Sequence, residues 1–180
     1  MDDRRVIYRG RKVDLALQPV ILGDGSTADR EVVLHRGAVA LLVMIDRDHV
    51  CLVKNHRYTV GRTLWEVPAG TIDAGESPDE TAPRELTEET GYIAGHIQRI
   101  AEWLVSPGVM NERMFLYLCE YLTPGPTSHQ PDERLEPVVV AWDEAVEMVE
   151  DGRIEDAKSM LAILYWDRRR VQAGMKIHKE

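Results

Sequence analysis

The amino-acid sequence predicts an α/β fold of the α+β kind: an α/β/α sandwich with a mixed sheet, preceded by a small antiparallel β extension. Three observations lead to this prediction. Apolar stretches of strand length recur over most of the chain. One strongly polar segment with helical spacing interrupts them near the middle. Helical patterns close the chain, and 180 residues suffice for one well-buried core.

The first 35 residues predict two or three antiparallel strands. Val13, Leu15 and Leu17 alternate with polar residues, and residues 23–26 read Gly-Asp-Gly-Ser, which is typical of a turn. This piece has too few apolar residues to be stable by itself. We therefore expect residues 1–35 to pack against the main domain, residues 36–180, or against a second subunit.

The main domain begins with the apolar run AVALLVMI at 38–45, which is typical of a buried central strand. A strand over 50–53 is expected to pair with this central strand, and residues 55–58 lead away from it. Further strands are expected over 64–67, 97–104, 114–121 and 138–142.

Two helices are expected after the last strand. Asp143 is in a position to cap the first, which Gly152 ends, and the second begins near Asp156. The buried face expected for the final helix consists of Met160, Leu161, Leu164 and Tyr165.

Composition excludes several classes of function. A net charge of −9 argues against a nucleic-acid or membrane surface, and no apolar run is long enough to span a bilayer. The N-terminus does not resemble a signal peptide. Cys51 and Cys119 lie in apolar stretches and are interpreted as reduced core thiols, so a cytoplasmic location is expected.

The most informative stretch is 70–92, GTIDAGESPDETAPRELTEETGY. On a helix, Glu85 and Glu89 share one face, Glu88 lies beside them, and Arg84 reaches Glu88. Acids outnumber the base, and like charges at this spacing repel. Carboxylate oxygens are hard ligands, so this cluster predicts a site for Mg²⁺, with Mn²⁺ as a possible substitute.

The start of this helix is ambiguous. Ser77, Pro78 and Glu80 form a capping box with proline at the first helical position. Pro83 then falls where an amide should already donate, at a cost of about 3 kcal/mol. Either the first turn is distorted, or the regular helix begins near Thr81 or Ala82.

The spacing G-x5-E-x7-R-E-U-x-E-E-x-G-U, with U apolar, is filled by Gly70, Glu76, Arg84, Glu85, Leu86, Glu88, Glu89, Gly91 and Tyr92. This stretch resembles the Nudix box. The alternative is a solvated acidic surface helix, which would still need an apolar face. The resemblance implies the Nudix fold and hydrolysis of a diphosphate joined to another group.

Flanking residues are similar to those of ADP-ribose and ADP-sugar pyrophosphatases. The box is entered through E-V-P-A-G at 66–70, and Pro107 follows it within S-P-G-x3-E at 106–112. This resemblance implies hydrolysis of ADP-ribose, or a related nucleoside diphosphate sugar, to AMP and ribose 5-phosphate or a sugar phosphate. It also implies a homodimer in which the N-terminal region is exchanged.

The resemblance also assigns roles to individual residues. Glu85 and Glu89 match the main metal ligands, Glu88 a secondary one, and Ala69 a position whose backbone carbonyl binds metal. Arg84 is expected to orient the acids, and the role of Glu76 varies among relatives. Residues expected to contact substrate are Arg36, Arg57, Glu66, Ser106, Gly108 and Glu112.

Alternatives remain open for the two arginines and for the general base. Arg57 and Arg36 suit a diphosphate because guanidinium forks onto two oxygens, but each could instead form a surface ion pair or be structural. For the general base, Glu133 is favoured over Glu136, and a solvated loop charge remains the alternative.

Other functions also remain open at this point. The substrate could be a GDP-sugar, NADH or a dinucleoside polyphosphate. A nucleotide-binding module without catalysis is a further reading, against which the full set of box acids argues. The expected partner is a small nucleotide sugar.

Overall fold

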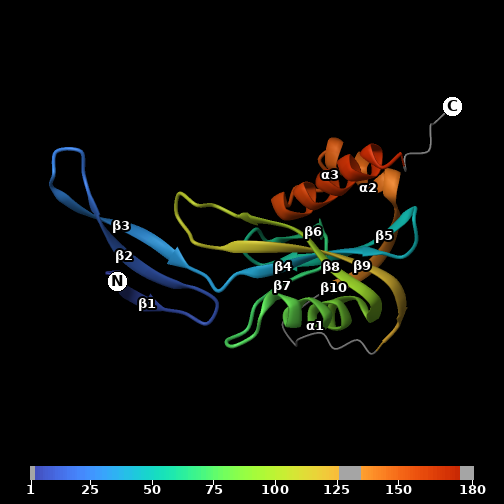
Figure 1. Ribbon diagram of the computed structural model, residues 1–180, viewed down its shortest axis with the longest axis horizontal. Helices are drawn as coiled ribbons and strands as arrows, with labels where there is room; N and C mark the ends of the chain where they lie inside the picture. The colour runs from blue at the N-terminus through green and yellow to red at the C-terminus, as the bar shows by residue number, and fades with distance from the viewer. Residues whose placement is uncertain (1–2, 126–134, 175–180) are drawn as a thin grey trace.

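The computed structural model describes residues 3–125 and 135–174 as two β-sheets and three helices (Figure 1). The first sheet contains β1 (Arg5–Arg9), β2 (Asp14–Ile21) and β3 (Thr27–Leu34). The second contains β4 (Ala38–Met44), β5 (His49–Arg57), β6 (Arg62–Glu66), β7 (Ala69–Thr71), β8 (Tyr92–Leu104), β9 (Arg113–Pro124) and β10 (Leu135–Ala141). The helices are α1 (Pro78–Thr90), α2 (Trp142–Glu150) and α3 (Ala157–Gln172).

The N-terminal sheet has three antiparallel strands and extends away from the rest of the molecule (Figure 1). The β2–β3 turn is fixed by Asp24, whose side chain accepts hydrogen bonds from the amide and hydroxyl of Ser26. Of the residues in these three strands, only Ala16 is fully buried. The sheet therefore has no core of its own, as its composition predicts.

The main sheet is organised around β4. Its order is β10-β5-β4-β9-β8, with β6 paired to β5 and β7 paired to β4. The β4–β9 pair is parallel, with Ala38 opposite Met114, and the other pairs in this sheet are antiparallel. All seven residues of β4 are buried, so the prediction of a central strand is confirmed.

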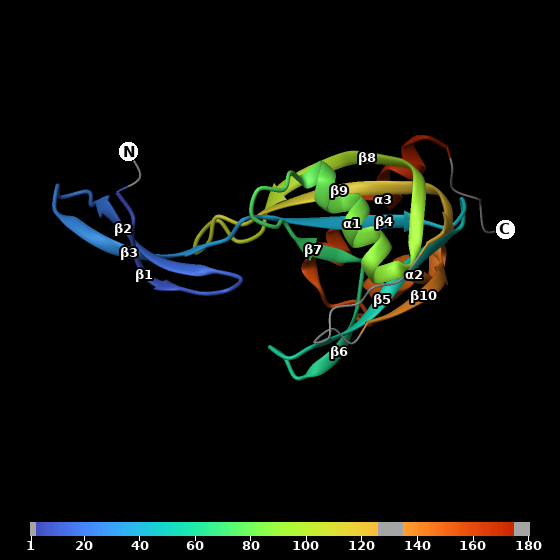
Figure 2. The ribbon, with the colours of Figure 1, turned by 90° about the horizontal axis from the view of Figure 1, so that it is seen from below.

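Helices cover both faces of the main sheet, with α1 on one side and α2 and α3 on the other (Figures 1 and 2). Alternate residues of β4 enter two separate hydrophobic cores, because successive side chains of a strand point to opposite faces. Ala40 and Leu42 pack with α2 and α3, whereas Val39 and Leu41 pack with Ala82 and Leu86 of α1. The predicted α/β/α sandwich with a mixed sheet is confirmed.

The sheet splits at β4 in a way that opens a cleft. The start of β4 pairs with β7, and its end pairs with β5. Beyond this point β5 continues to Arg57 by pairing with β6, so it is longer than the sequence indicated. The far end of β5 and the strand β7 therefore diverge, and residues of both line the space between them.

The capping box of Ser77 and Glu80, with Pro78 at the first helical position, is confirmed. Helix α1 begins at Pro78, so the alternative of a start near Thr81 or Ala82 is ruled out. Pro83 lies inside this helix and cannot donate to the carbonyl four residues earlier, but Ala82 and Leu86 are fully buried and hold the helix in place. Helix α2 begins at Trp142 with Ala141 as its cap, so Asp143 does not cap it.

The face expected for α3 is confirmed for Met160 and Tyr165, which pack against the core, and wrong for Leu161 and Leu164. Leu161 and Leu164 are 43% and 44% exposed, whereas Ala162 and Ile163 are fully buried. Asp156 does cap this helix, accepting from the Ser159 amide. Within the part of the chain that the structure describes, no helix is both long enough and apolar enough to cross a membrane.

Candidate active site

A polar cleft of about 410 Å³ opens between the far end of β5, the strand β7 and helix α1. Its lining carries both charges. Helix α1 provides two carboxylates and Arg84, whereas the segments outside α1 provide Arg11, Lys12, Arg36 and Arg57, which we call the cationic wall. The residues that line it are Arg11, Lys12, Arg36, Asn55, His56, Arg57, Tyr58, Ala69, Gly70, Thr71, Asp73, Arg84, Glu85 and Glu89.

The carboxylates of Glu85 and Glu89 lie on the face of α1 that packs toward β7. Both residues are buried, with 8% and 4% of their surfaces exposed, although both line the cleft. The helix that carries them ends at Gly91, which has a left-handed φ of 71° and donates its amide to the Thr87 carbonyl. That conformation favours glycine, which accounts for the residue at the end of the motif.

Gly70 and Glu85 approach so closely that no side chain could be accommodated at position 70. A Cβ atom there would lie 1.9 Å from Cδ of Glu85 and 2.0 Å from its Oε1. The glycine that opens the motif is therefore required by contact with the carboxylate, not by an unusual φ. A larger residue would have to displace the Glu85 carboxylate from this position.

Glu89 is attached to the strand opposite. Its Oε2 accepts a hydrogen bond of 2.9 Å from the amide of Ala69. The preceding carbonyl, of Pro68, accepts from the amide of Leu41 in β4. The 68–70 segment is thus held by the central strand on one side and by an α1 carboxylate on the other.

Arg84 organises the remaining acids. Its Nε and Nη2 donate to the two carboxylate oxygens of Glu76, both at 2.8 Å, and its Nη1 donates to Glu85 at 2.8 Å and to Glu88 at 3.1 Å. These bonds lower the pKa of Glu76 to about 2 and raise the pKa of Arg84. The ion pairs expected of Arg84 are present, and its catalytic role stays a prediction.

The oxygen atoms around α1 are of the type that binds a hard divalent cation, but they do not converge on a single point. Among the described residues, no three His, Cys, Asp or Glu side chains converge in metal-binding geometry. The reason is that Arg84 draws Glu85 and Glu88 to its guanidinium, while Glu89 turns to the Ala69 amide. Carboxylates and a nearby backbone carbonyl remain the ligand set that Mg²⁺ prefers. The metal roles of Ala69, Glu85, Glu88 and Glu89 stay predictions.

Arg57 lines the cleft and is also ion-paired. Its Nε donates to Oε1 of Glu66 at 2.7 Å and its Nη2 to Oε2 at 2.5 Å, which raises the pKa of Arg57. The side chain of Arg57 is 38% exposed, whereas that of Glu66 is 1% exposed. Arg57 can thus face the cleft while paired. Glu66 does not line the cleft itself, and its expected contact with substrate stays a prediction.

The cationic wall of the cleft contains residues that sequence reasoning missed. Arg36 lines the cleft as expected, and its Nη2 donates to the Arg11 carbonyl at 3.2 Å. Arg11 and Lys12, from the connection between β1 and β2, line it as well. The basic run Arg9-Gly10-Arg11-Lys12 was the available signal, but nothing in the sequence placed it beside residues 69–89.

The other predicted residues lie elsewhere. Ser106 and Gly108, in the β8–β9 connection, do not line the cleft. Glu112 belongs to the same connection and does not line the cleft either, and its carboxylate is 3.6 Å from Nδ1 of His35. Glu136 lies on β10 and pairs with Lys54 at 3.3 Å. Glu133, the favoured general base, lies outside the described residues, so its placement is untested.

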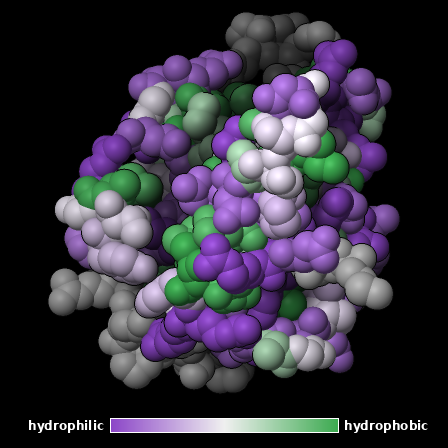
Figure 3. All heavy atoms as spheres, turned by 90° about the vertical axis from the view of Figure 1, so that its left-hand side faces the viewer, coloured by the Kyte–Doolittle hydropathy of each residue, from purple (hydrophilic) through white to green (hydrophobic). Residues whose placement is uncertain are grey.

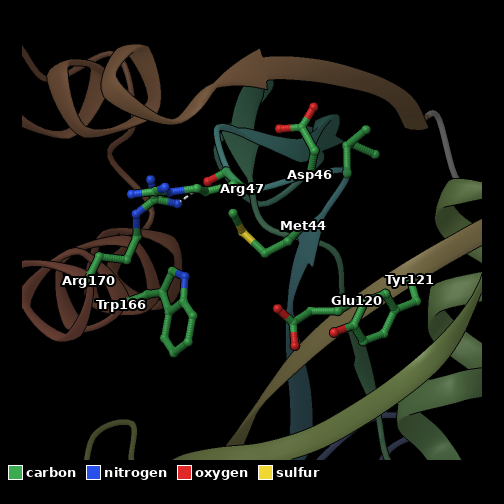
Figure 4. Close-up of a pocket in the computed structure, with 8 residues that line it drawn as sticks. Met44, Asp46, Arg47, Glu120, Tyr121, Trp166 and Arg170 are labelled. Carbon is green, nitrogen blue, oxygen red and sulfur yellow. Dashed lines mark hydrogen bonds between the residues drawn. The ribbon is translucent and has the colours of Figure 1, made fainter. Parts of the chain in front are cut away.

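A second cavity, of about 260 Å³, lies at the other end of β4 (Figure 4). It is lined by Met44, Glu120, Tyr121, Trp166 and Arg170, among others. The guanidinium of Arg170 is held by the Arg47 carbonyl and by Asp48. The carboxylates of the 70–92 motif are absent from this cavity, so the cleft beside α1 is the candidate active site.

Comparison with known proteins gives a consistent result. The model of the NUDIX domain family matches residues 34–163. The chain is 38% identical over 161 residues to an ADP-ribose pyrophosphatase of Bacillus subtilis, covering 88% of this chain and 87% of that protein. It is 31% identical over 158 residues to a GDP-mannose pyrophosphatase of Yersinia enterocolitica, covering 81% and 82%.

A solved structure described as an ADP compounds hydrolase shares the fold. Its TM-score is 0.83, and the match covers 97% of this chain and 95% of that one, at 21% sequence identity. At this identity the likeness concerns the fold alone, and it includes the N-terminal sheet as well as the main domain.

Proposed function

The chain belongs to the Nudix family of pyrophosphohydrolases, and from this premise we propose that it hydrolyses the diphosphate bond of ADP-ribose or a related nucleoside diphosphate sugar. The observation that carries the proposal is the contact between the Glu85 carboxylate and Gly70 at the mouth of a cleft whose other wall is cationic. Relatives named as ADP-ribose pyrophosphatases support this substrate class.

The acidic wall is proposed to bind Mg²⁺ through Glu85 and Glu89, with Glu88 and the Ala69 carbonyl as further ligands. Such a cation neutralises a diphosphate and lowers the pKa of bound water. Arg84 would hold the carboxylates in place before binding, since it already contacts Glu85 and Glu88. Mn²⁺ would be tolerated because it prefers similar oxygen ligands.

The cationic wall is proposed to bind the substrate. Arg36 and Arg57 line the cleft opposite α1, and guanidinium groups can form two parallel hydrogen bonds to phosphate oxygens. Arg11 and Lys12 add positive charge at the same site. These local cations offset the formal net charge of −9, which would otherwise repel a diphosphate.

The general base is proposed to be Glu133, with Glu136 as the alternative. Glu136 is paired with Lys54 in this structure, which leaves it less available as a proton acceptor. Comparing Glu133→Gln with Glu136→Gln over a pH series would separate them. The variant that loses turnover and the acidic limb of its pH profile identifies the base.

The activity is tested with purified protein, Mg²⁺ and a substrate panel of ADP-ribose, ADP-glucose, GDP-mannose, NADH and diadenosine polyphosphates. We expect ADP-ribose to give AMP and ribose 5-phosphate in equal amounts, with no turnover when EDTA is present. GDP-mannose belongs in the panel because one relative is named for it. If none of these compounds is hydrolysed with Mg²⁺ or Mn²⁺, the proposed function is wrong.

We also propose that the protein is a homodimer formed through residues 1–35. In the N-terminal sheet Ile7, Tyr8 and Ile21 are 48%, 63% and 80% exposed, and hydrophobic residues are visible among polar ones on this side of the molecule (Figure 3). A second copy is the expected occupant. Light scattering should give twice the chain mass, and an Ile21→Asp, Tyr8→Asp variant should give a monomer. A monomeric wild type would contradict the proposal.

A cytoplasmic location stays a prediction; both cysteines are free and buried.

A further inference from the structure

A cluster of polar and charged residues from β5, β6 and the start of α3 extends inward from Arg57 at the cleft. It consists of Arg57, Glu66, Asp156, Lys158 and Ser159. We propose that Lys158 is a positioning residue: it binds Glu66, and Glu66 in turn holds the Arg57 guanidinium at the cleft. The inference rests on the proposed function, because it assigns Arg57 to substrate binding.

The contacts form a continuous chain from α3 to the cleft. Nζ of Lys158 donates to Oε2 of Glu66 at 2.5 Å, and the same oxygen accepts from Nη2 of Arg57 at 2.5 Å. Oε1 of Glu66 accepts from Nε of Arg57 at 2.7 Å. Lys158 itself does not line the cleft, so it reaches a substrate only through these two residues.

The cluster is balanced in charge, which a buried site requires. Two cations, Arg57 and Lys158, are matched by two anions, Glu66 and Asp156. Nζ of Lys158 lies 2.8 Å from Oδ2 of Asp156. Burial would raise the pKa of Asp156, but the charge of Lys158 and hydrogen bonds from Ser159 outweigh it, and the net pKa is lowered.

Ser159 connects the cluster to Val67, in the segment between β6 and β7 that leads into the motif. Oγ of Ser159 accepts from the amide of Val67 at 2.8 Å and donates to Oδ2 of Asp156 at 2.5 Å. Ser159 is fully buried. Because Asp156 both caps α3 and binds Lys158, the helix start sets the position of Glu66 and Val67 together.

Removing the positive charge of Lys158 would leave Glu66 with a single cationic partner. Because Arg57 already makes two short hydrogen bonds to Glu66, the two side chains would then be free to move as a pair, and the Arg57 guanidinium would lose its fixed position at the cleft. Replacing a residue that orients a functional group typically lowers affinity or activity by on the order of tenfold or more. The expected loss is in substrate affinity, so KM should rise more than kcat falls.

The experiment compares Lys158→Met, which keeps the length of the side chain, with Lys158→Arg, which keeps its charge. Arg62→Met is the matched control, since Arg62 forms an equally short ion pair with Glu155 on the surface. We expect kcat/KM for ADP-ribose to fall about tenfold in Lys158→Met, to recover largely in Lys158→Arg, and to be unchanged in Arg62→Met.

Two further measurements separate positioning from a general loss of stability. In a double-mutant cycle, adding Lys158→Met to Arg57→Met should cost little more than Arg57→Met alone. The ¹⁵N resonance of Arg57 Nε should shift in Lys158→Met and not in Arg62→Met. An unshifted Arg57 resonance, or fully additive effects on kcat/KM, would overturn the inference.

The NMR measurement also keeps the two hypotheses distinguishable. If the wild type hydrolyses nothing in the panel, the proposed function fails, and the Arg57 resonance still decides whether Lys158 positions it. If the wild type is active and the resonance does not respond, only the positioning role is wrong.

Discussion

Two clusters of charged residues lie close to the cleft, and they differ in balance. Around Arg84, four acids approach a single base: Glu76, Glu85, Glu88 and, at 3.8 Å, Asp73. Around Glu66, two acids meet two bases, and the side chains of Glu66 and Lys158 are only 1% and 13% exposed. Both clusters reach the cleft, the first through Arg84 and Glu85 and the second through Arg57.

The difference indicates what each cluster is for. A balanced buried cluster satisfies its own charges and can act as a scaffold, because adding or removing one ion would leave a charge unpaired. An excess of acids at a cleft is not satisfied by the protein alone, and we expect a cation to complete it. The comparison therefore predicts that losing an acid harms activity in the first cluster and stability in the second.

The largest effect is expected for Glu85→Gln, which should lower kcat by 10³-fold or more, equivalent to about 4 kcal/mol. The fold should be retained, since the change removes one of several neighbouring negative charges. Steady-state kinetics with Mg²⁺, together with thermal unfolding, provide the check. Glu150→Gln, an exposed acid of α2, is the control. Near-wild-type turnover by Glu85→Gln would contradict the role assigned to the acidic cluster.

The second effect is on stability. Glu66→Gln should lower the free energy of unfolding by about 3 kcal/mol, because the largely buried Lys158 would lose an ion-pair partner and Arg57 would lose the anion to which it makes two hydrogen bonds. Glu155→Gln breaks the exposed pair with Arg62 and should cost far less, because solvent screens exposed ion pairs. Urea denaturation of both variants measures the difference. Equal losses would show that the buried cluster is no more structural than a surface pair.

The third effect is stabilisation by metal. At a Mg²⁺ concentration of about 100 times Kd, the wild type should gain about 2.7 kcal/mol in free energy of unfolding. Glu85→Gln should gain much less, whereas Lys158→Arg should respond like the wild type. Thermal unfolding with and without Mg²⁺ tests this, with EDTA as the reference. A wild type that does not respond would mean that the acid excess does not bind the cation.

The smallest effect is the pH dependence of the Glu76–Arg84 pair in metal-free protein. The pKa of Glu76 is about 2, below its ordinary value of 4.5, so the pair contributes stability above pH 4.5 and loses it as pH falls toward 2. Because Glu76 is partly exposed, we expect about 1 kcal/mol. The stability difference between wild type and Glu76→Gln should therefore be present at pH 7 and shrink below pH 4. A difference that stays constant with pH would show that ionisation of Glu76 is not its source.

The sequence predicted what local patterns encode. The apolar run at 38–45 indicated the central strand, and the spacing of Glu85, Glu88 and Glu89 placed them together on a helix. The capping box at Ser77 indicated the start of α1, and burial of Ala82 and Leu86 outweighs the later start that Pro83 left open. The same local view misplaced part of the buried face of α3, where Ala162 and Ile163 are buried while Leu161 and Leu164 are exposed.

Contacts between distant segments were beyond prediction from sequence. Lys158 and Glu66 are 92 positions apart, and nothing in either neighbourhood identifies the other as its partner. Arg11 and Lys12 line the cleft because the connection between β1 and β2 lies beside it. The pairing of Glu66 with Lys158 likewise became apparent only in three dimensions.

The parallel pairing of β4 with β9 has a consequence for how the chain assembles. Ala38 lies opposite Met114, so the centre of the sheet joins segments 76 residues apart, with α1 and β8 in between. Pairings over such separations form slowly because a long loop must close first. During synthesis, one edge of β4 therefore stays unpaired until β9 has been made. A growing chain that stops before residue 113 would leave this buried, apolar strand exposed and prone to aggregation.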